Sequence, residues 1–161
     1  MRKKVLLAID LQQQFKDGEG KAEEVVRYIE ENAGNYDYIV LTCFSQDIYG
    51  SRNELYLNKL HWDGCMSCSI DDLLPNTDKR IVLIKNSYGL TLKGVLNSDS
   101  ITVDVVGCDA DACILATCFR LWDNGYDFNI LTKYIYSTAK DIDINTVFAI
   151  MKRNFGDCVI E

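Results

Sequence analysis

Short apolar runs recur along the chain, and each has the length of a β-strand. Most are nearly continuous stretches of aliphatic side chains, without the strict alternation of apolar and polar residues that marks a strand exposed on one face. Such runs are typical of strands that are buried on both faces. Five lie at 5–9, 38–43, 81–84, 101–106 and 128–131, and a marginal sixth lies at 158–160.

Segments with helical periodicity separate these runs. Helices are predicted over 22–33, 112–122 and 143–154, and Gly34, Asn124-Gly125 and Gly156 supply stop signals after them. Two shorter helical patterns lie at 69–74 and 90–96. In the helix over 112–122, we expect one apolar face to point inward: Ala112, Leu115, Ala116, Phe119 and Trp122.

The alternation of strand and helix along the chain predicts the fold class. Buried strands joined by helices form a parallel sheet with helices on both faces. We therefore expect an α/β protein with three layers (α/β/α), built on a doubly wound, mainly parallel sheet of five to six strands of the Rossmann-like kind. The 161 residues fit a single domain over 1–161, with no repeat or linker inside it.

Net charge and cysteine content limit the possible binding partners and the cellular compartment of the protein. The net charge of −7 disfavours binding to nucleic acid or to an anionic membrane surface. The apolar run after the basic N-terminus ends at Asp10, which is too soon for a secretion signal. Seven cysteines, an odd number spread over a mid-sized chain, do not indicate a disulfide framework. We expect a cytoplasmic protein whose cysteines are mostly reduced.

Three ionisable residues stand where a doubly wound sheet binds ligands, at the carboxyl ends of strands. Asp10 follows the first strand and Lys85 the third, while Cys113 lies in the first turn of the helix after the fourth strand. Because a helix N-terminus and a lysine both favour a thiolate, the pattern predicts a lowered thiol pKa. A carboxylate can take the thiol proton during attack. Asp, Lys and Cys are thus sufficient for acyl transfer, although each residue alone has ordinary structural explanations.

Three segments resemble isochorismatase-like cysteine hydrolases, the family that includes nicotinamidases and N-carbamoylsarcosine amidases. LLAIDLQQQF (6–15) is similar to the opening strand of the family with its D-x-Q-x-x-F motif, and IKNSYGLTL (84–92) is similar to the segment that carries the family's lysine. VVGCDADACILAT (105–117) is similar to the motif G-x-x-x-D-x-C-V-x-x-T-A, which it matches at Gly107, Asp111, Cys113 and Thr117.

The resemblance implies an activity and roles for residues. The chain would hydrolyse a small amide or related C–N bond through a thioester, with Asp10 as general base, Lys85 as electrostatic partner and Cys113 as nucleophile. It further implies a cis peptide between Cys108 and Asp109, and an oxyanion hole made by the amides of Asp109 and Cys113. Phe15, Phe44 and Tyr88 are the candidates for substrate contact. No cofactor is implied, and the family leads us to expect a homo-oligomer (dimer or tetramer).

The chain also departs from the family. Nicotinamidases carry an Asp-x-His pair after the second strand as part of a metal site, and the corresponding residues here, 42–46, read TCFSQ. We therefore predict no metal site and no nicotinamidase activity. Isochorismatases that cleave a vinyl ether generally lack the cysteine, so Cys113 argues against that reaction too.

Two alternatives stay open. Cys65 and Cys68 form a C-x-x-C pair, with His61 nearby in the sequence, which is compatible with redox chemistry or half of a zinc site. The chain could also be a catalytically inactive member of the family that serves as a binding protein. Loss of function on Cys65→Ser in place of Cys113→Ser would favour the redox or zinc interpretation.

Overall fold

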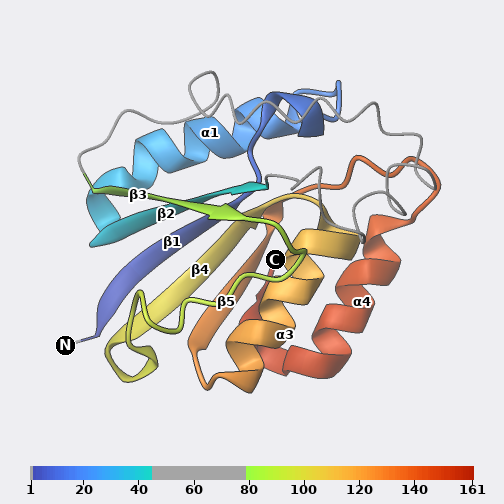
Figure 1. Ribbon diagram of the computed structural model, residues 1–161. Coiled ribbons are helices and arrows are strands. Elements are labelled where there is room, and N and C mark those ends of the chain that lie inside the picture. Colours follow the sequence, from blue (N-terminus) through green and yellow to red (C-terminus); the bar gives the residue numbers. More distant parts are fainter. Residues whose placement is uncertain (1, 45–78) are drawn as a thin grey trace.

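The fold is a parallel sheet between two helical layers (Figure 1). In a computed structural model, residues 2–44 and 79–161 are described. Their six strands are all parallel and stand in the order β3-β2-β1-β4-β5-β6. The strands are β1 (Lys3–Ile9), β2 (Tyr38–Phe44), β3 (Arg80–Lys85), β4 (Ile101–Gly107), β5 (Asp127–Ile135) and β6 (Val159–Ile160). This arrangement confirms the predicted fold class, including the marginal sixth strand.

Each face of the sheet has its own core. The long helices are α1 (Lys21–Asn32), α3 (Leu115–Asp123) and α4 (Ile144–Phe155). On β1, Leu6 and Ala8 pack with Ile29 of α1, whereas Val5, Leu7 and Ile9 belong to the core beneath α3 and α4. Since successive side chains of a strand point to opposite faces, the continuous apolar run of β1 fills both cores at once.

One of the two shorter helices predicted from the sequence is absent. The segment 90–96 makes a single turn, closed by the amides of Val95 and Leu96 on the carbonyl of Leu92, in place of a helix. Gly94 has a left-handed φ of 88°, which stops the helix from propagating. The capped helix predicted at 69–74 lies outside the described residues.

The buried face of α3 also differs from the prediction. Thr117, Cys118 and Leu121 are buried, while Phe119 and Trp122 are partly exposed. The rings of these two pack on Phe155 of α4, with centroid distances of 5.0 and 5.8 Å. The apolar pattern missed this face because its buried members include a threonine. The hydroxyl of Thr117 accepts a hydrogen bond from the amide of Leu90 at 3.1 Å, so the polar group is satisfied inside the core.

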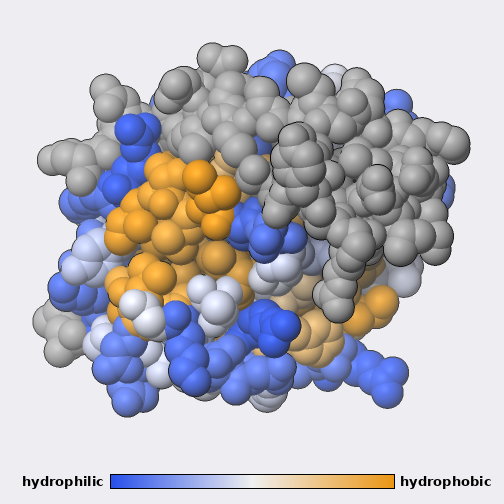
Figure 2. Space-filling model, viewed as in Figure 1, coloured by the Kyte–Doolittle hydropathy of each residue, from blue (hydrophilic) through white to orange (hydrophobic). Residues whose placement is uncertain are grey.

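The outer strand β3 is less buried than its apolar sequence predicted. Val82 and Ile84 are exposed, as expected for a strand at the edge of a sheet, and Figure 2 shows apolar surface in this part of the molecule, to the left of the view. Lys85 at the end of the same strand is buried. Among the described residues, no helix has the length and apolar character needed to cross a membrane.

Candidate active site

The order of the strands determines where the site can form. Chain connections lead outward from β1 to β2 and β3 on one side, and from β4 to β5 and β6 on the other, so β1 and β4 flank the point where strand order reverses. Ile9 pairs with Gly107 at the carboxyl ends of these two strands. A Cβ at Gly107 would lie 2.2 Å from the carbonyl oxygen of Ile9, and φ at Gly107 is +111°. Only glycine fits this close approach of two backbones.

Asp10 follows β1 in a conformation that is unusual for its residue type. Its φ is +53°, and aspartate is among the few residues that enter this left-handed region without prohibitive cost. The carbonyl of Asp10 accepts hydrogen bonds from the amide of Gln12 at 2.8 Å and from the thiol of Cys108 at 3.4 Å. The side chain of Asp10 is fully buried. The local backbone therefore turns the carboxylate to the end of the sheet and holds it there.

Cys113 lies in a wide helical turn that precedes α3. The turn Ala110–Ile114 is a π-helix, in which the amide of Ile114 donates to the carbonyl of Asp109 at 3.0 Å. Single π-turns inside α-helices are frequent at functional sites. The peptide between Cys108 and Asp109 is cis, as the resemblance implied.

The structure brings Asp10, Lys85 and Cys113 together. The ammonium Nζ of Lys85 lies 2.6 Å from the carboxylate Oδ2 of Asp10 and 3.3 Å from the thiol Sγ of Cys113. To reach them from β3, the lysine side chain crosses the end of β2, where Nζ lies 4.9 Å from the centre of the Phe44 ring. Nζ also donates to the carbonyls of Ser87 and Tyr88. All three side chains are buried, which excludes bulk water from the ion pair.

The pKa of the thiol contradicts the sequence-based prediction. Burial, and after it the negative charge of Asp10, raise the pKa of Cys113 to about 12, against the lowering effect of Lys85. The sequence argument counted the helix terminus and the lysine, but it left out the cost of placing a thiolate in a dry site beside a carboxylate. At neutral pH, Cys113 is therefore a protonated thiol with a base beside it.

Two residues that the sequence analysis did not select hold this site in place. Thr42 of β2 accepts a hydrogen bond from the amide of Asp10 at 3.0 Å and donates to Oδ1 of the same residue at 2.5 Å. Gln12 exchanges two hydrogen bonds with the backbone of Phe44, at 2.7 and 3.2 Å, and so ties the ends of β1 and β2 together. Gln12 stood in the recognised motif without a role. Thr42 carried no signal except its position near the end of a strand beside β1.

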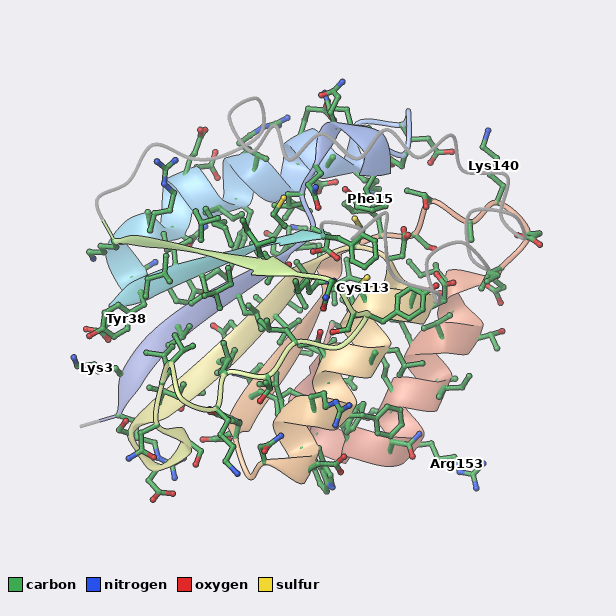
Figure 3. The ribbon with its side chains drawn as sticks, in the orientation of Figure 1. Lys3, Phe15, Tyr38, Cys113, Lys140 and Arg153 are labelled. Atoms are coloured by element: carbon green, nitrogen blue, oxygen red, sulfur yellow. The ribbon has the colours of Figure 1, made fainter. Side chains whose placement is uncertain are left out.

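A pocket of about 350 Å³ opens in front of Cys113. The three predicted contact residues, Phe15, Phe44 and Tyr88, form part of its wall. Figure 3 shows Phe15 and Cys113 next to each other at the carboxyl ends of the strands. The rest of the lining comes from the turn before α3 and from the end of β5: Asp109, Asp111, Ala112, Thr138 and Ala139. The last two were missed because the sequence analysis ended the fifth strand at 131, whereas β5 continues to Ile135.

The predicted oxyanion hole remains a prediction. The amide of Asp109 belongs to the cis peptide and Cys113 lies in the helical turn, and both residues line the pocket. Within 2–44 and 79–161, no three His, Cys, Asp or Glu side chains are grouped so that they could hold a metal ion. His61, Cys65 and Cys68 lie outside these ranges, so the redox and zinc alternatives are not tested.

Comparisons with known proteins identify the fold of this chain. No protein-family profile and no curated protein sequence matches this chain. Solved structures do match, at low sequence identity. A nicotinamidase from Staphylococcus aureus has 20% identity and a TM-score of 0.69, with 100% of both chains covered. An isochorismatase-like hydrolase from Alkaliphilus metalliredigens has 18% identity and a TM-score of 0.72, covering 98% of this chain and 94% of that one.

An N-carbamoylsarcosine amidase from Thermoplasma acidophilum shares the same architecture. It has 19% identity and a TM-score of 0.69, covering 98% of this chain and 95% of that one. Coverage of this extent means that the likeness includes both helical layers and the whole sheet. The chain therefore has the isochorismatase-like hydrolase fold, which confirms the fold class and the resemblance that its sequence predicted.

Proposed function

We propose that this protein is a cysteine-dependent amidase that hydrolyses a small amide or related C–N bond. One observation carries the proposal: a buried lysine ammonium bridges a carboxylate at 2.6 Å and a thiol at 3.3 Å, and the residue that bears this thiol lines a pocket. Such a group supplies a nucleophile, a base and a positive charge within contact of one another. Two of the structural neighbours are amidases by name, a nicotinamidase and an N-carbamoylsarcosine amidase.

In the first half of the proposed reaction, Sγ of Cys113 attacks the carbonyl carbon and its proton passes to Asp10. The new S–C bond gives a tetrahedral intermediate, whose oxygen carries the negative charge and is met by the amides of Asp109 and Cys113. Asp10 then gives the proton to the leaving nitrogen as the C–N bond breaks, which releases an amine and leaves a thioester on Cys113.

The second half repeats the proton transfers with water. Asp10 takes a proton from the water that attacks the thioester, the S–C bond breaks, and the thiolate of Cys113 recovers the proton. Lys85 keeps its proton throughout and balances the charge of Asp10. In this sequence, the raised pKa of Cys113 means that the nucleophile forms only as it attacks.

A metal ion has no step in this mechanism, because the residues do not suit one. Nicotinamidases carry an Asp-x-His pair after the second strand, and the corresponding residues here, 42–46, read TCFSQ and include neither an aspartate nor a histidine. The nearby hydroxyl of Thr42 is committed to Asp10. A homo-oligomer and a cytoplasmic location stay predictions.

The test compares the full chain with Cys113→Ala and with Cys158→Ala, a matched change of a half-buried thiol outside the pocket. A panel of small neutral and charged amides is assayed for released amine. We expect Cys113→Ala to abolish turnover and Cys158→Ala to retain it. Acid-quenched mass spectrometry during turnover should show an acyl group on the peptide that contains Cys113.

Full turnover by Cys113→Ala would contradict the proposal. Loss of activity on Cys65→Ser, with Cys113→Ser unaffected, would support the redox or zinc interpretation. Binding of amides without turnover by any member of the panel would support the inactive binding protein.

A further inference from the structure

Aromatic and acidic residues line different parts of the pocket wall. Phe15, Phe44 and Tyr88 line one part of it with aromatic rings. The rings of Phe15 and Phe44 meet edge to face, and those of Phe44 and Tyr88 are nearly parallel, each pair with centroids 6.5 Å apart. The other part is lined by the acidic residues Asp109 and Asp111, with Thr138 and two alanines beside them. A ligand in this space therefore meets an apolar, π-electron-rich surface and a pair of acids.

Both acids are held by neutral partners. Asp109 accepts hydrogen bonds from the amide of Thr138 at 2.7 Å and from its hydroxyl at 3.1 Å. Asp111 accepts a short hydrogen bond from the hydroxyl of Ser137 through Oδ1, and Oδ2 has no partner among the described residues. Neither acid caps the helical turn through its side chain or takes part in an ion pair within 2–44 and 79–161. Their negative charge is thus uncompensated by the described part of the protein.

Among residues 2–44 and 79–161, the positive charges near the pocket are either paired already or directed away from it. Lys85 lies against Asp10, so this pair contributes no net charge. Lys140, on the loop that follows the pocket-lining residues, is exposed and extends away from Cys113 in Figure 3. Burial raises the pKa of Asp109, so the surroundings themselves oppose its charge. A bound cation would relieve this cost.

These observations describe what the ligand must supply. Two carboxylates that keep free acceptor capacity, in a pocket of limited size, are suited to N–H donors with a positive charge. The aromatic rings also attract a cation, and they offer an apolar surface to the carbon chain that carries it. An anionic ligand would meet two like charges at short range, and a neutral ligand would add no counter-charge to the two carboxylates, which form no ion pair with another described residue.

We propose that the substrate is a small amide that also carries a cationic N–H group of the ammonium or guanidinium kind. The amide carbonyl would face Cys113, the cation would lie against Asp109 and Asp111, and the linking carbons would pass along the three aromatic rings. This inference rests on the proposed amidase function, because it assigns the substrate class of that site.

The experiment uses three series of amides of matched length, each with two to four methylene groups between the amide and its far end. The far end is an ammonium, a methyl or a carboxylate. The ratio of kcat/KM between the ammonium and the methyl series reports the preference for charge. We expect a ratio of about tenfold or more in the native protein, as one charge-assisted hydrogen bond would give. We expect a ratio near one in the double variant Asp109→Asn/Asp111→Asn.

Asparagine keeps one acceptor oxygen, which can still accept from the amide of Thr138 at position 109 and from the hydroxyl of Ser137 at position 111. At position 109, its NH2 group can donate to the hydroxyl of Thr138, which donates to Oδ2 in the native protein. Asp99→Asn is the matched control, because this exposed residue lies just before β4, at the end of the sheet opposite the pocket. It changes the net charge in the same direction and should leave the ratio unchanged. A double variant that fails to fold is replaced by Asp111→Asn alone, for which the ratio should still fall.

Binding separates this inference from the proposed function. Calorimetric titration of Cys113→Ala with the same three series measures the charge preference without turnover. Preferential binding of the ammonium series, lost in the aspartate variants, supports the inference even where no amide is hydrolysed, and in that case the amidase proposal alone fails. Equal or better binding and turnover of the methyl or carboxylate series would overturn the inference and leave the amidase proposal intact. Absence of binding by any series to Cys113→Ala would also overturn it.

Discussion

Replacement of Lys85 by methionine tests the electrostatic arrangement on which the site depends. Methionine keeps much of the volume of the lysine stem and removes the ammonium, which leaves the carboxylate of Asp10 buried without its ion-pair partner. For charges 2.6 Å apart, an effective dielectric constant of about 20 gives an attraction of about 6 kcal/mol before desolvation is subtracted. Removal of one partner from a buried pair typically costs about 3–5 kcal/mol. We expect a loss of this size in the free energy of unfolding.

The assay is urea unfolding at neutral pH, followed by circular dichroism, of the native chain, Lys85→Met, Asp10→Asn and the double variant. The double variant should be more stable than the sum of the single changes predicts, by about 2 kcal/mol or more, because no unpaired charge is left behind. Asparagine tolerates the left-handed φ of position 10 and can still accept a hydrogen bond from Thr42.

Lys152→Met supplies the control. This lysine lies 3.7 Å from Asp157 at the surface, where both side chains are largely exposed, so its loss should not change stability measurably. A cost below about 1 kcal/mol for Lys85→Met would refute the reasoning, because a contact that weak belongs to an exposed pair. Strict additivity of the two single changes would refute it equally, since it would mean that the two charges do not interact.

Three further predictions concern the surroundings of the site. Thr42→Val should lower kcat about ten- to a hundredfold with little change in KM, because Asp10 loses the hydroxyl that orients it. Thr42→Ser should keep most of the native rate, and equal losses in both variants would contradict this positioning role. Gly107→Ala should destabilise the protein by more than about 3 kcal/mol in thermal unfolding, because the added Cβ would lie 2.2 Å from a carbonyl oxygen. Gly34→Ala is the control and should be nearly neutral, because a Cβ at position 34 meets no atom within 4 Å. Burial raises the pKa values of Cys108, Cys113 and Cys118, so these thiols stay protonated in the folded protein above the pH at which they ionise in the unfolded chain. Their contribution to stability is complete below about pH 8.5 and is lost as the pH rises beyond it, by about 1.4 kcal/mol per pH unit for each thiol, and a urea midpoint unchanged between neutral pH and pH 10 would contradict this.

The sequence predicted what depends on local periodicity and on motif spacing. Continuous apolar runs predicted the strands, and positions at or near strand ends predicted that Asp10, Lys85 and Cys113 lie together. What it could not predict depends on contacts across the sheet. The role of Thr42 follows from the pairing of β1 with β2, and the pocket residue Thr138 follows from the full length of β5. Neither is encoded by the residues next to it in the chain.

The face of α3 and the pKa of Cys113 were predicted wrongly for a related reason. A helical wheel ranks side chains by their own polarity, but Thr117 is buried because the amide of Leu90 supplies its partner from another segment. Likewise, the dipole of a helix and one lysine favour a thiolate, but the burial of Cys113, and after it the negative charge of the buried Asp10, raise the pKa of the thiol. In both cases, the effect of residues from other segments of the chain outweighs the preference set by the neighbouring residues in the sequence.

The raised pKa of Cys113 is what the proposed mechanism needs, because it keeps the buried charge constant. With Asp10 ionised, Lys85 protonated and Cys113 neutral, the three groups carry no net charge in the resting state. A preformed thiolate would add a net negative charge to a site that excludes water, at a cost of several kcal/mol. During attack, the proton moves from Cys113 to Asp10 while the charge moves to the substrate oxygen, so the sum of the three groups and a neutral amide group remains zero. The positive charge of Lys85 is therefore balanced by one negative charge at every step, first on the carboxylate and then on the tetrahedral intermediate.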